Sequence, residues 1–396
     1  MTLPLEGVRV VEVAQYVAGP LAGSLLAELG AEVIKVEPPG GDAYRKVMPV
    51  APGIGRFFVP LNRGKRSVVL DLKAADGCAA LAQLVATADV VIHNSPAARA
   101  ASFGLGWETL HAEHPVLVVG VVTSFGPHGP LACRPAYDLV AQGRSGLLTS
   151  HASRGDTVPV RAGGIPMADL TAGHLLASGV LAALVAARGG GEGRIVEVSL
   201  LGAALAVQIQ DLVWLDGEAV GPAVAATRGG LEARADEIAG GLAMNPYYRC
   251  YEAADGFLAI ACLNLVQRES FLGLFRLEDA TIATPDLVPT EADVLEEKQR
   301  VTTVIEEEIA TGSVEAWLAH LGSAAVPAGP VLARESVHAD EQARANGLLQ
   351  DVEQPGLGPM TMLGGVFRFD GEDPAAIRPA PSLGADTEAV LREVGA

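Results

Sequence analysis

Short runs of β-branched residues alternate with longer apolar stretches along the first part of the chain. Residues 8–14 (VRVVEVA) and 32–37 (EVIKVE) are typical of strands, and residues 19–29 between them have the pattern of a helix closed by Gly30. The alternation continues with strand-like runs at 66–72, 90–93 and 115–123 and a helical stretch at 74–88. This pattern is typical of a parallel sheet with helices on both faces, so we expect an α/β fold.

The rest of the chain predicts one long helix, a linker and a further block of elements. The apolar segment 170–187 predicts a long buried helix, followed by a strand at 194–200 and an apolar helix to about residue 215. Residues 216–241 are rich in Gly and Ala with little periodicity, which is typical of a linker. Beyond it we expect two short strands around the turn at 254–256, helices over 294–309 and after the N-cap Ser313, and a last helix at 387–394.

Length and composition limit the classes to which the chain can belong. At 396 residues it exceeds the usual size of a single core, so two domains are expected. The formal net charge of −19 argues against nucleic acid or an anionic membrane as a partner, because either would need a basic face. Four scattered cysteines and an N-terminus without a basic and then apolar stretch predict a cytoplasmic protein. The apolar stretch 175–187 is short for a membrane span.

Familiar cofactor motifs are missing from the sequence. The first turn of the predicted βαβ unit reads AQYVAGPLAG at residues 14–23 and lacks the glycines that let a pyrophosphate approach the backbone, although Glu37 stands where a ribose-binding acid would lie. His111 and His114 have no third metal ligand nearby in the sequence, so we expect no metal site. The basic run NRGKRS at residues 62–67 is either a solvated loop or a dock for phosphates.

Asp169 directly precedes the apolar segment 170–187, and a carboxylate at this place has two possible roles. It can be the N-cap that satisfies free backbone N–H groups, since aspartate is among the commonest N-cap residues. It can also be an anionic nucleophile held at the positive end of the helix. Position alone favours the cap, so the choice depends on the rest of the chain.

An ordered set of short motifs extends over essentially the whole chain. They read LEGVRV at 5–10, AGP at 18–20, LGAEVIKVE at 29–37, NRGKRS at 62–67, LDLK at 70–73, GLG at 104–106, RPAYD at 134–138, ADLTAG at 168–173, NPY at 245–247, DG at 255–256 and GPV at 329–331. Each motif is weak alone. Together and in this order they resemble the class III CoA-transferases, the family that contains the formyl-CoA and carnitine CoA-transferases.

The resemblance implies an α/β fold in two domains. It implies a large Rossmann-like domain with a parallel sheet formed by both chain ends, and a smaller α+β domain inserted into it. On this sequence the large domain would begin with residues 1–215, the linker would be 216–241, the small domain 242–324, and a second linker with the C-terminal part of the large domain 325–396. The resemblance also implies a homodimer of two interlocked subunits.

The resemblance further implies that Asp169 is the nucleophile of a CoA-transferase. Its carboxylate would attack the thioester of an acyl-CoA to give a mixed anhydride, and the released CoA thiolate would then form an aspartyl–CoA thioester. An acceptor carboxylic acid would reverse the sequence. A carboxylate suits this chemistry because its anhydride can exchange with a thiolate in both directions. CoA would be a substrate, acyl-CoA and a carboxylic acid the partners, and no metal or redox cofactor would be needed.

Other residues of the matching motifs would bind the two parts of the substrate. For CoA, the resemblance suggests Lys73, Asn94, Arg99, Arg66 and Arg134. For the acyl group and the acceptor acid, it suggests Tyr137, Val17 and Gln15. Val17 stands where the formyl-CoA enzymes have a glutamine, so we do not expect oxalate or formate as substrates.

Two alternatives stay open. The acyl-CoA racemases of the same superfamily resemble these transferases but pair the aspartate with a histidine at the position of Tyr137. A phenol, with a pKa near ~10, is a poor base at neutral pH, so the sequence favours transfer over racemisation. The other alternative is a protein of this fold that binds CoA without turnover.

Overall fold

The computed structural model describes residues 2–150, 158–159, 161–213, 215–216, 245–283, 292–372 and 375–396. The chain forms two compact units. One comprises Met1–Leu147, Gly163–Val220 and His338–Ala396, and the other comprises Leu148–Ala162 and Gly221–Val337. The first unit therefore contains both chain ends, and the second is inserted into it. The linker expected at 216–241 lies outside the described residues except for Asp216.

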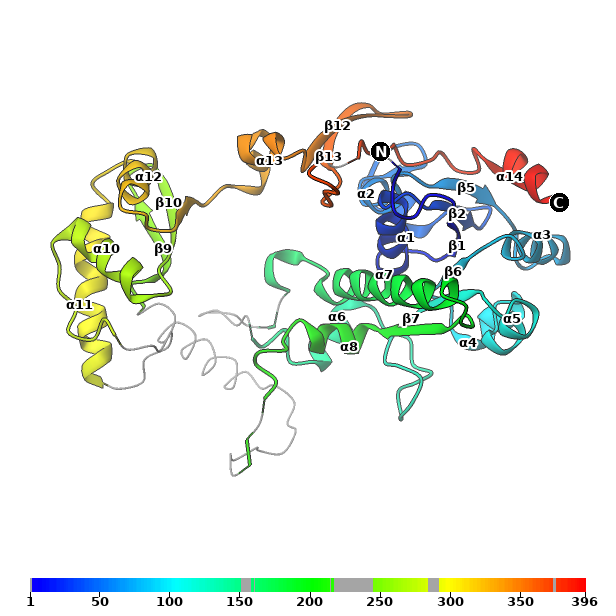
Figure 1. The fold of residues 1–396 in the computed structure, drawn as a ribbon, viewed down its shortest axis with the longest axis horizontal. Coiled ribbons are helices and arrows are strands. Elements are labelled where there is room, and N and C mark those ends of the chain that lie inside the picture. The colour runs from blue at the N-terminus through cyan, green and yellow to red at the C-terminus, as the bar shows by residue number, and fades with distance from the viewer. Residues whose placement is uncertain are drawn as a thin grey trace. The chain divides into compact units, whose positions relative to one another are not determined.

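A sheet of six parallel strands forms the centre of the first unit (Figure 1). The strands are β1 (Arg9–Val13), β2 (Glu32–Glu37), β5 (Arg66–Val69), β6 (Val90–His93), β7 (Val118–Thr123) and β8 (Ile195–Ser199). Their spatial order is β5-β2-β1-β6-β7-β8, and every neighbouring pair is parallel. This is the strand order of the Rossmann fold, in which the order of adding strands reverses between β1 and β6. The predicted α/β fold with a Rossmann-like large domain is confirmed.

Helices cover both faces of this sheet, because successive strand residues point to opposite sides. Val10, Val33 and Val118 belong to a core covered by α1 (Ala18–Glu28), α7 (Met167–Arg188) and α8 (Leu200–Ala206). The residues after them in the strands belong to a second core on the other face. That face is covered by α3 (Ala75–Val85), α4 (Ala97–Ser102), α5 (Trp107–Glu113) and α14 (Thr387–Val394).

The C-terminal segment joins the first unit without adding a strand to its large sheet. All six strands of that sheet lie between residues 9 and 199, which corrects the expectation that both chain ends form it. The physical reason lies at the edge strand β5. Asp386 Oδ2 accepts a hydrogen bond from the Ser67 N–H at 2.8 Å, and Thr387 Oγ1 accepts one from the Val69 N–H at 3.0 Å. The start of α14 thus occupies the N–H groups that another strand would use.

Two predicted helices have different bounds in the structure. The helix expected to reach about residue 215 is α8, which ends at Ala206. Gln208 Nε2 donates to the Ala204 carbonyl at 2.7 Å, so a side chain takes an acceptor that a continuing helix would use. The apolar helix α7 has 22 residues, which is long enough by length and composition to cross a membrane. It packs instead in the first core, where Ala172, Leu176 and Val180 are buried.

In its described residues, the second unit contains an antiparallel sheet in the order β11-β10-β9 with three α-helices. Its elements are β9 (Tyr248–Ala253), β10 (Gly256–Ala261), α10 (Leu265–Phe275), α11 (Ala292–Ile309), α12 (Val314–Ser323) and β11 (Ala328–Pro330). The predicted hairpin around residues 254–256 is confirmed. So is the N-cap Ser313, whose hydroxyl accepts from the Ala316 N–H.

The remaining elements within the described residues are short. They are η1 (Ala43–Lys46), β3 (Pro49–Ala51), β4 (Ile54–Gly55), α2 (Phe58–Asn62), α6 (Asp138–Arg144), η2 (Ala162–Gly164), η3 (Arg334–Ala339), α13 (Glu341–Ala345), β12 (Leu349–Gln354) and β13 (Gly358–Leu363). Of these, α6 matters most for function, because it begins beside the start of α7.

Candidate active site

The site lies at the carboxyl ends of β1 and β6, where the strand order reverses. In open parallel sheets this is the crevice that binds ligands. The Asn94 side chain, directly after β6, joins the two strand ends. Its Oδ1 accepts from the Gln15 N–H at 3.2 Å, and its Nδ2 donates to the Gln15 carbonyl at 2.7 Å. Gln15 and Asn94, both expected in the site from the sequence, are thus brought together.

Asp138 links the helix α6 to the start of α7. Its carboxylate is 4% exposed, and Oδ1 accepts from the Ala168 N–H at 2.9 Å and from the Asp169 N–H at 3.4 Å. The N-cap position of α7 is Pro166, whose side chain makes no capping hydrogen bond. The N-cap role that position alone favoured for Asp169 is therefore wrong. Asp138 supplies the capping carboxylate, and Asp169 lies in the first turn of the helix.

Asp169 is half-buried at the N-terminal end of α7. The positive end of a long helix stabilises an ionised carboxylate, which is the form that attacks an electrophile. Gly173, one turn further along α7, lies against α1: a Cβ built on it would be 2.9 Å from the Ala18 carbonyl oxygen and 2.9 Å from Leu21 Cβ. This close packing places the start of α7 beside the β1–α1 loop.

Three tyrosines flank this loop. Tyr16 has a φ of 71°, in the left-handed region that non-glycine residues rarely adopt. Its ring contacts those of Tyr137 and Tyr44 edge to face, with centroids 5.5 and 5.6 Å away. A hydrogen bond with Tyr137, and then burial, raise the pKa of the Tyr16 hydroxyl. Tyr137 itself is 64% exposed and directly precedes Asp138, so the tyrosines border the start of α7. Val17, expected to contact the substrate, is buried at the start of α1.

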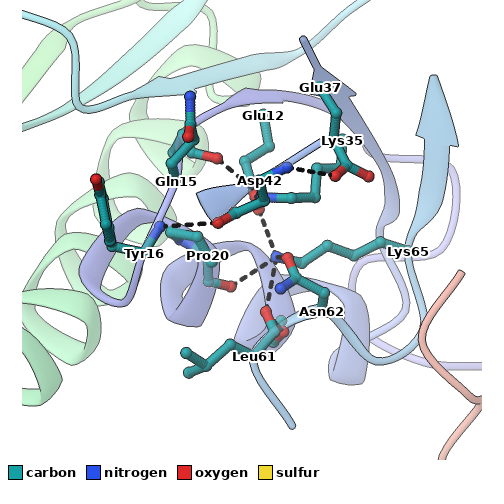
Figure 2. A network of polar contacts seen from close by, with 12 residues as sticks. Glu12, Gln15, Tyr16, Pro20, Lys35, Glu37, Asp42, Leu61, Asn62 and Lys65 are labelled. Atoms are coloured by element: carbon teal, nitrogen blue, oxygen red, sulfur yellow. Dashed lines mark hydrogen bonds and ion pairs between the residues drawn. The ribbon is translucent and has the colours of Figure 1, made fainter. Parts of the chain in front are cut away.

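A buried network of charges lies beside the loop and is bonded to it (Figure 2). Glu12, in β1, accepts from Lys35 Nζ at 2.9 Å and from Lys65 Nζ at 2.6 Å. Lys35 also pairs with Asp42 at 2.9 Å, and Asp42 Oδ1 accepts from the Tyr16 N–H at 3.4 Å. The chain of contacts therefore runs from the centre of the sheet to the strained residue of the site.

Burial and opposite charges act against each other on the two lysines. Burial lowers the pKa of Lys65 to about 8, against the attraction of Glu12. Burial has the same direction at Lys35, but Glu12 and Asp42 more than offset it and raise the pKa of Lys35. Lys65 Nζ also donates to the Pro20 and Leu61 carbonyls and to Asn62 Oδ1. Each of the two buried ammonium groups thus lies against at least three oxygen atoms, which holds the adjoining loop rigidly.

The cationic residues expected to bind CoA divide into two groups. Lys73, Arg99 and Arg134 are exposed and follow β5, β6 and β7 respectively, so they stand on the carboxyl-end side of the sheet with Asn94. Arg66 begins β5 and lies at the opposite edge. Its guanidinium pairs there with Glu32 at 2.5 Å and with Glu393 at 2.8 Å.

The phosphate-dock interpretation of residues 62–67 is not favoured by the contacts. Arg63 pairs with Glu28 at 2.9 Å, and Lys65 is enclosed by oxygens of the protein. Glu37 is equally occupied, since Arg45 bonds both of its carboxylate oxygens, which leaves no ribose-binding acid at that strand end. Across the described residues, no three His, Cys, Asp or Glu side chains are grouped to hold a metal ion.

The sequence does not identify the residues that hold the site in place without being expected to touch the substrate. Asp138 was visible as part of a motif, but its contact is with a helix that begins thirty residues later. Glu12 and Lys35 carried a clearer signal, because each is a charge inside an apolar strand run and they are direct partners in the β1–β2 register. Tyr16 carried none, because nothing in its neighbours requires a left-handed backbone.

Comparison with known proteins shows the protein family to which the chain is similar. It matches the model of CoA-transferase family III over residues 5–387. It is 34% identical to the succinate–glutarate CoA-transferase of Agrobacterium fabrum, over 99% of this chain and 96% of that protein. It is 29% identical to the succinyl-CoA:glutarate CoA-transferase of Homo sapiens, over 99% and 86%. A CaiB/BaiF family protein from Brucella suis has a solved structure that matches with a TM-score of 0.79 at 29% identity, covering 100% of both chains.

Proposed function

The chain belongs to CoA-transferase family III, and we propose that it moves CoA from an acyl-CoA to a carboxylic acid through covalent intermediates on Asp169. The observation that carries this proposal is the place of Asp169. Its half-buried carboxylate stands at the N-terminal end of α7, and another residue, Asp138, supplies the cap. A carboxylate that the helix does not need as its cap is suited to a chemical role.

The proposed reaction has two halves that mirror each other. An Asp169 oxygen attacks the thioester carbonyl, the C–S bond breaks, and CoA leaves as the thiolate with a mixed anhydride on the enzyme. The thiolate then attacks the aspartyl carbonyl, which releases the first acid and leaves an aspartyl–CoA thioester. The acceptor carboxylate attacks that carbonyl, expels the thiolate and forms a second anhydride. Attack of the thiolate on the new acyl carbonyl gives the new acyl-CoA and restores Asp169. These steps balance without an oxidant or a metal.

We assign the acyl group to the residues of the β1–α1 loop and its tyrosines, and the CoA phosphates to the exposed cations. Tyr137 and Tyr16 border the start of α7, and Gln15 and Val17 belong to the same loop. Lys73, Arg99 and Arg134 are exposed on the same side of the sheet, in a chain whose net charge is −19. A phosphate chain would therefore be attracted only locally. The contacts of Arg66 with Glu32 and Glu393 leave it out of this assignment.

The names of the relatives suggest the acids to test first. The Agrobacterium and human relatives are named for succinate and glutarate, and a relative from Chloroflexus aurantiacus is named for succinyl-CoA and L-malate. We therefore propose dicarboxylic acids as the substrate class and take succinyl-CoA with glutarate as the first pair. Racemisation is not favoured, because Tyr137 stands where the racemases have a histidine.

The test is to trap the intermediate on Asp169. The enzyme is mixed with succinyl-CoA and hydroxylamine, and the modified peptide is located by mass spectrometry. We expect a hydroxamate on Asp169, and we expect Asp169→Ala to lower CoA transfer to glutarate by roughly 10³-fold or more, as loss of a covalent nucleophile does. Asp76→Ala is the matched control, because Asp76 is an exposed first-turn aspartate of α3. Transfer that survives Asp169→Ala would refute the mechanism. Exchange of an α-proton with solvent deuterium and no adduct would indicate a racemase.

We also propose a homodimer and a cytoplasmic location. Support for the dimer comes from the segment after α8, where Ile209, Val213 and Leu215 are 75, 62 and 64% exposed. Apolar side chains this exposed in one segment are typical of an interface. Light scattering on the purified protein tests the dimer, and a monomeric mass at micromolar concentration would contradict it. Cell fractionation tests the location.

A further inference from the structure

The first turn of α7 has an unusual set of hydrogen-bond partners. Pro166, the N-cap, has no N–H to donate, and the Met167 N–H donates to the Ile165 carbonyl at 2.9 Å. The next two N–H groups, of Ala168 and Asp169, both donate to Asp138 Oδ1. The first bond within the helix is from the Leu170 N–H to the Pro166 carbonyl at 3.0 Å. The backbone of Asp169 is therefore held by a side chain from another helix.

That side chain is itself held. Asp138 Oδ2 accepts from Gln142 Nε2 at 2.8 Å, one turn further along α6, and Gln142 is 1% exposed. The same amide group donates to the Ile165 carbonyl at 3.3 Å, directly before the N-cap of α7. Asp138 thus binds N–H groups of the first turn of α7, and Gln142 binds the carbonyl group directly before its N-cap. Both side chains are buried, which restricts their reorientation.

We propose that Asp138, oriented by Gln142, is the positioning residue that fixes Asp169 for attack on the thioester. The inference rests on the proposed function, since it assumes that Asp169 is the nucleophile. Asp138 acts through the Asp169 main chain and needs no contact with the substrate. A nucleophile must be held within a few tenths of an ångström of its attacking position, and an error of about 1 Å can cost on the order of 10²-fold in rate.

A purely structural role for Asp138 would have a different signature. Loss of a helix cap lowers the melting temperature but leaves the chemical step of the folded molecules unchanged. Loss of a positioning residue slows the chemical step in folded enzyme and leaves substrate binding nearly as before. The rate of acylation of Asp169 in a single turnover, measured with the melting temperature and KM, separates the two.

The experiment compares wild type with Asp138→Asn, Asp138→Ala and Gln142→Met. With succinyl-CoA in rapid-quench mixing, we expect the acylation rate to fall by about 10-fold for Asp138→Asn and about 100-fold for Asp138→Ala. Asparagine keeps one acceptor oxygen for the backbone N–H groups, so it should retain more activity than alanine. KM for succinyl-CoA should stay within about 2-fold. Gln142→Met, which keeps the length but removes both donated hydrogen bonds, should slow acylation with KM likewise unchanged.

Asp340→Asn is the matched control. Asp340 caps α13, where its carboxylate accepts from the Ala343 N–H at 2.7 Å, so this variant also removes a capping carboxylate. We expect it to acylate at the wild-type rate. Folded Asp138 variants with the wild-type acylation rate, or with the loss confined to KM, would overturn the inference. If the Asp138 variants do not fold, an unchanged rate in Gln142→Met would overturn it. Wild type with no adduct on Asp169 would refute the proposed function too, whereas a wild-type adduct with unimpaired variants refutes only this inference.

Discussion

At the scale of single residues, Asn94 has two candidate roles: binding CoA and holding the β1–α1 loop. The sequence suggests a CoA contact, while the structure shows both ends of its amide bonded to the Gln15 backbone, with distances of 3.2 and 2.7 Å. The Gln15 peptide leads directly into Tyr16, whose φ of 71° costs energy unless its neighbours hold it. The amide of Asn94 therefore stabilises the strained loop of the site.

Asn94→Ala should separate these two roles. If Asn94 holds the loop, we expect kcat to fall by about 10-fold or more while KM for the acyl-CoA changes by less than about 3-fold. Steady-state kinetics with succinyl-CoA and glutarate measure both. A large rise in KM with kcat intact would instead assign Asn94 to CoA binding. Ser102→Ala is a suitable control, because the exposed Ser102 hydroxyl bonds only locally, to the Arg99 carbonyl of its own helix.

The residues of the site differ in how visible they are in the sequence. Asp169 is visible because it belongs to the motif at 168–173, and the resemblance carried by the ordered motifs, not its position before the apolar segment, suggests its chemical role. The role of Asp138 is not, because its hydrogen bonds join residues thirty positions apart, and no local pattern encodes such a contact. Position in the sequence therefore predicts the cap at Asp169, whereas in the structure the carboxylate of Asp138 supplies it.

At the scale of elements, the contact between α1 and α7 places the nucleophile. Gly173 permits it, since an added Cβ would be 2.9 Å from both the Ala18 carbonyl oxygen and Leu21 Cβ. Backbone atoms and a buried leucine cannot move away without shifting a helix. We expect Gly173→Ala to lower the free energy of unfolding by about 1–3 kcal/mol, the usual cost of overpacking.

For Gly273→Ala we expect the opposite change, a rise in the free energy of unfolding. Gly273 lies inside α10, and a Cβ there would meet no atom within 4 Å. Alanine should therefore stabilise this helix by about 0.5–1 kcal/mol, because it loses less backbone entropy than glycine on folding. Urea unfolding of both variants measures the difference. Equal effects of the two substitutions would mean that close packing of α1 on α7 is unimportant.

The sequence predicts most helices and strands of the described residues, and the differences in their bounds have local causes. The strand β2 was expected at 32–37 and the last helix at 387–394, and both have these bounds. The helix α8 is shorter than expected, and the apolar residues Val207, Ile209 and Val213 after it are exposed among the described residues. A helix gains most of its stability from the packing of its apolar face, so apolar periodicity alone overestimates its length.

At the scale of the whole molecule, the sequence indicated the class of fold better than its assembly. The alternation of strands and helices predicts a parallel sheet, and the structure has one with the strand order of the Rossmann fold. The way the C-terminal segment completes the first unit does not follow from any pattern. It depends on Asp386 and Thr387 binding the N–H groups of a strand more than three hundred residues earlier. Hydrogen bonds between residues this far apart in sequence leave no local pattern from which they could be predicted.

The stability of the first unit should depend on pH through His93. This residue ends β6, is 4% exposed, and burial lowers its pKa to about 4, although a hydrogen bond with the Ser95 backbone opposes the change. In the unfolded chain the pKa of a histidine is about 6.5. Between these two values the unfolded chain binds a proton that the folded chain does not. The contribution of neutral His93 is therefore complete above about pH 6.5 and is lost as the pH falls towards 4, by about 3 kcal/mol in total.

His93→Gln should reduce this acid sensitivity. We expect the loss in the free energy of unfolding between pH 6.5 and pH 4 to be smaller than in wild type by about 3 kcal/mol, whatever the effect on stability at neutral pH. Amide hydrogen exchange of β6 is the suitable measurement, since it reports on the unit that contains His93. The exposed His128 provides the control substitution, His128→Gln, which should leave the slope unchanged. If His93→Gln loses stability as steeply as wild type, the folded protein must bind the proton at His93 as readily as the unfolded chain, and burial would not control this site.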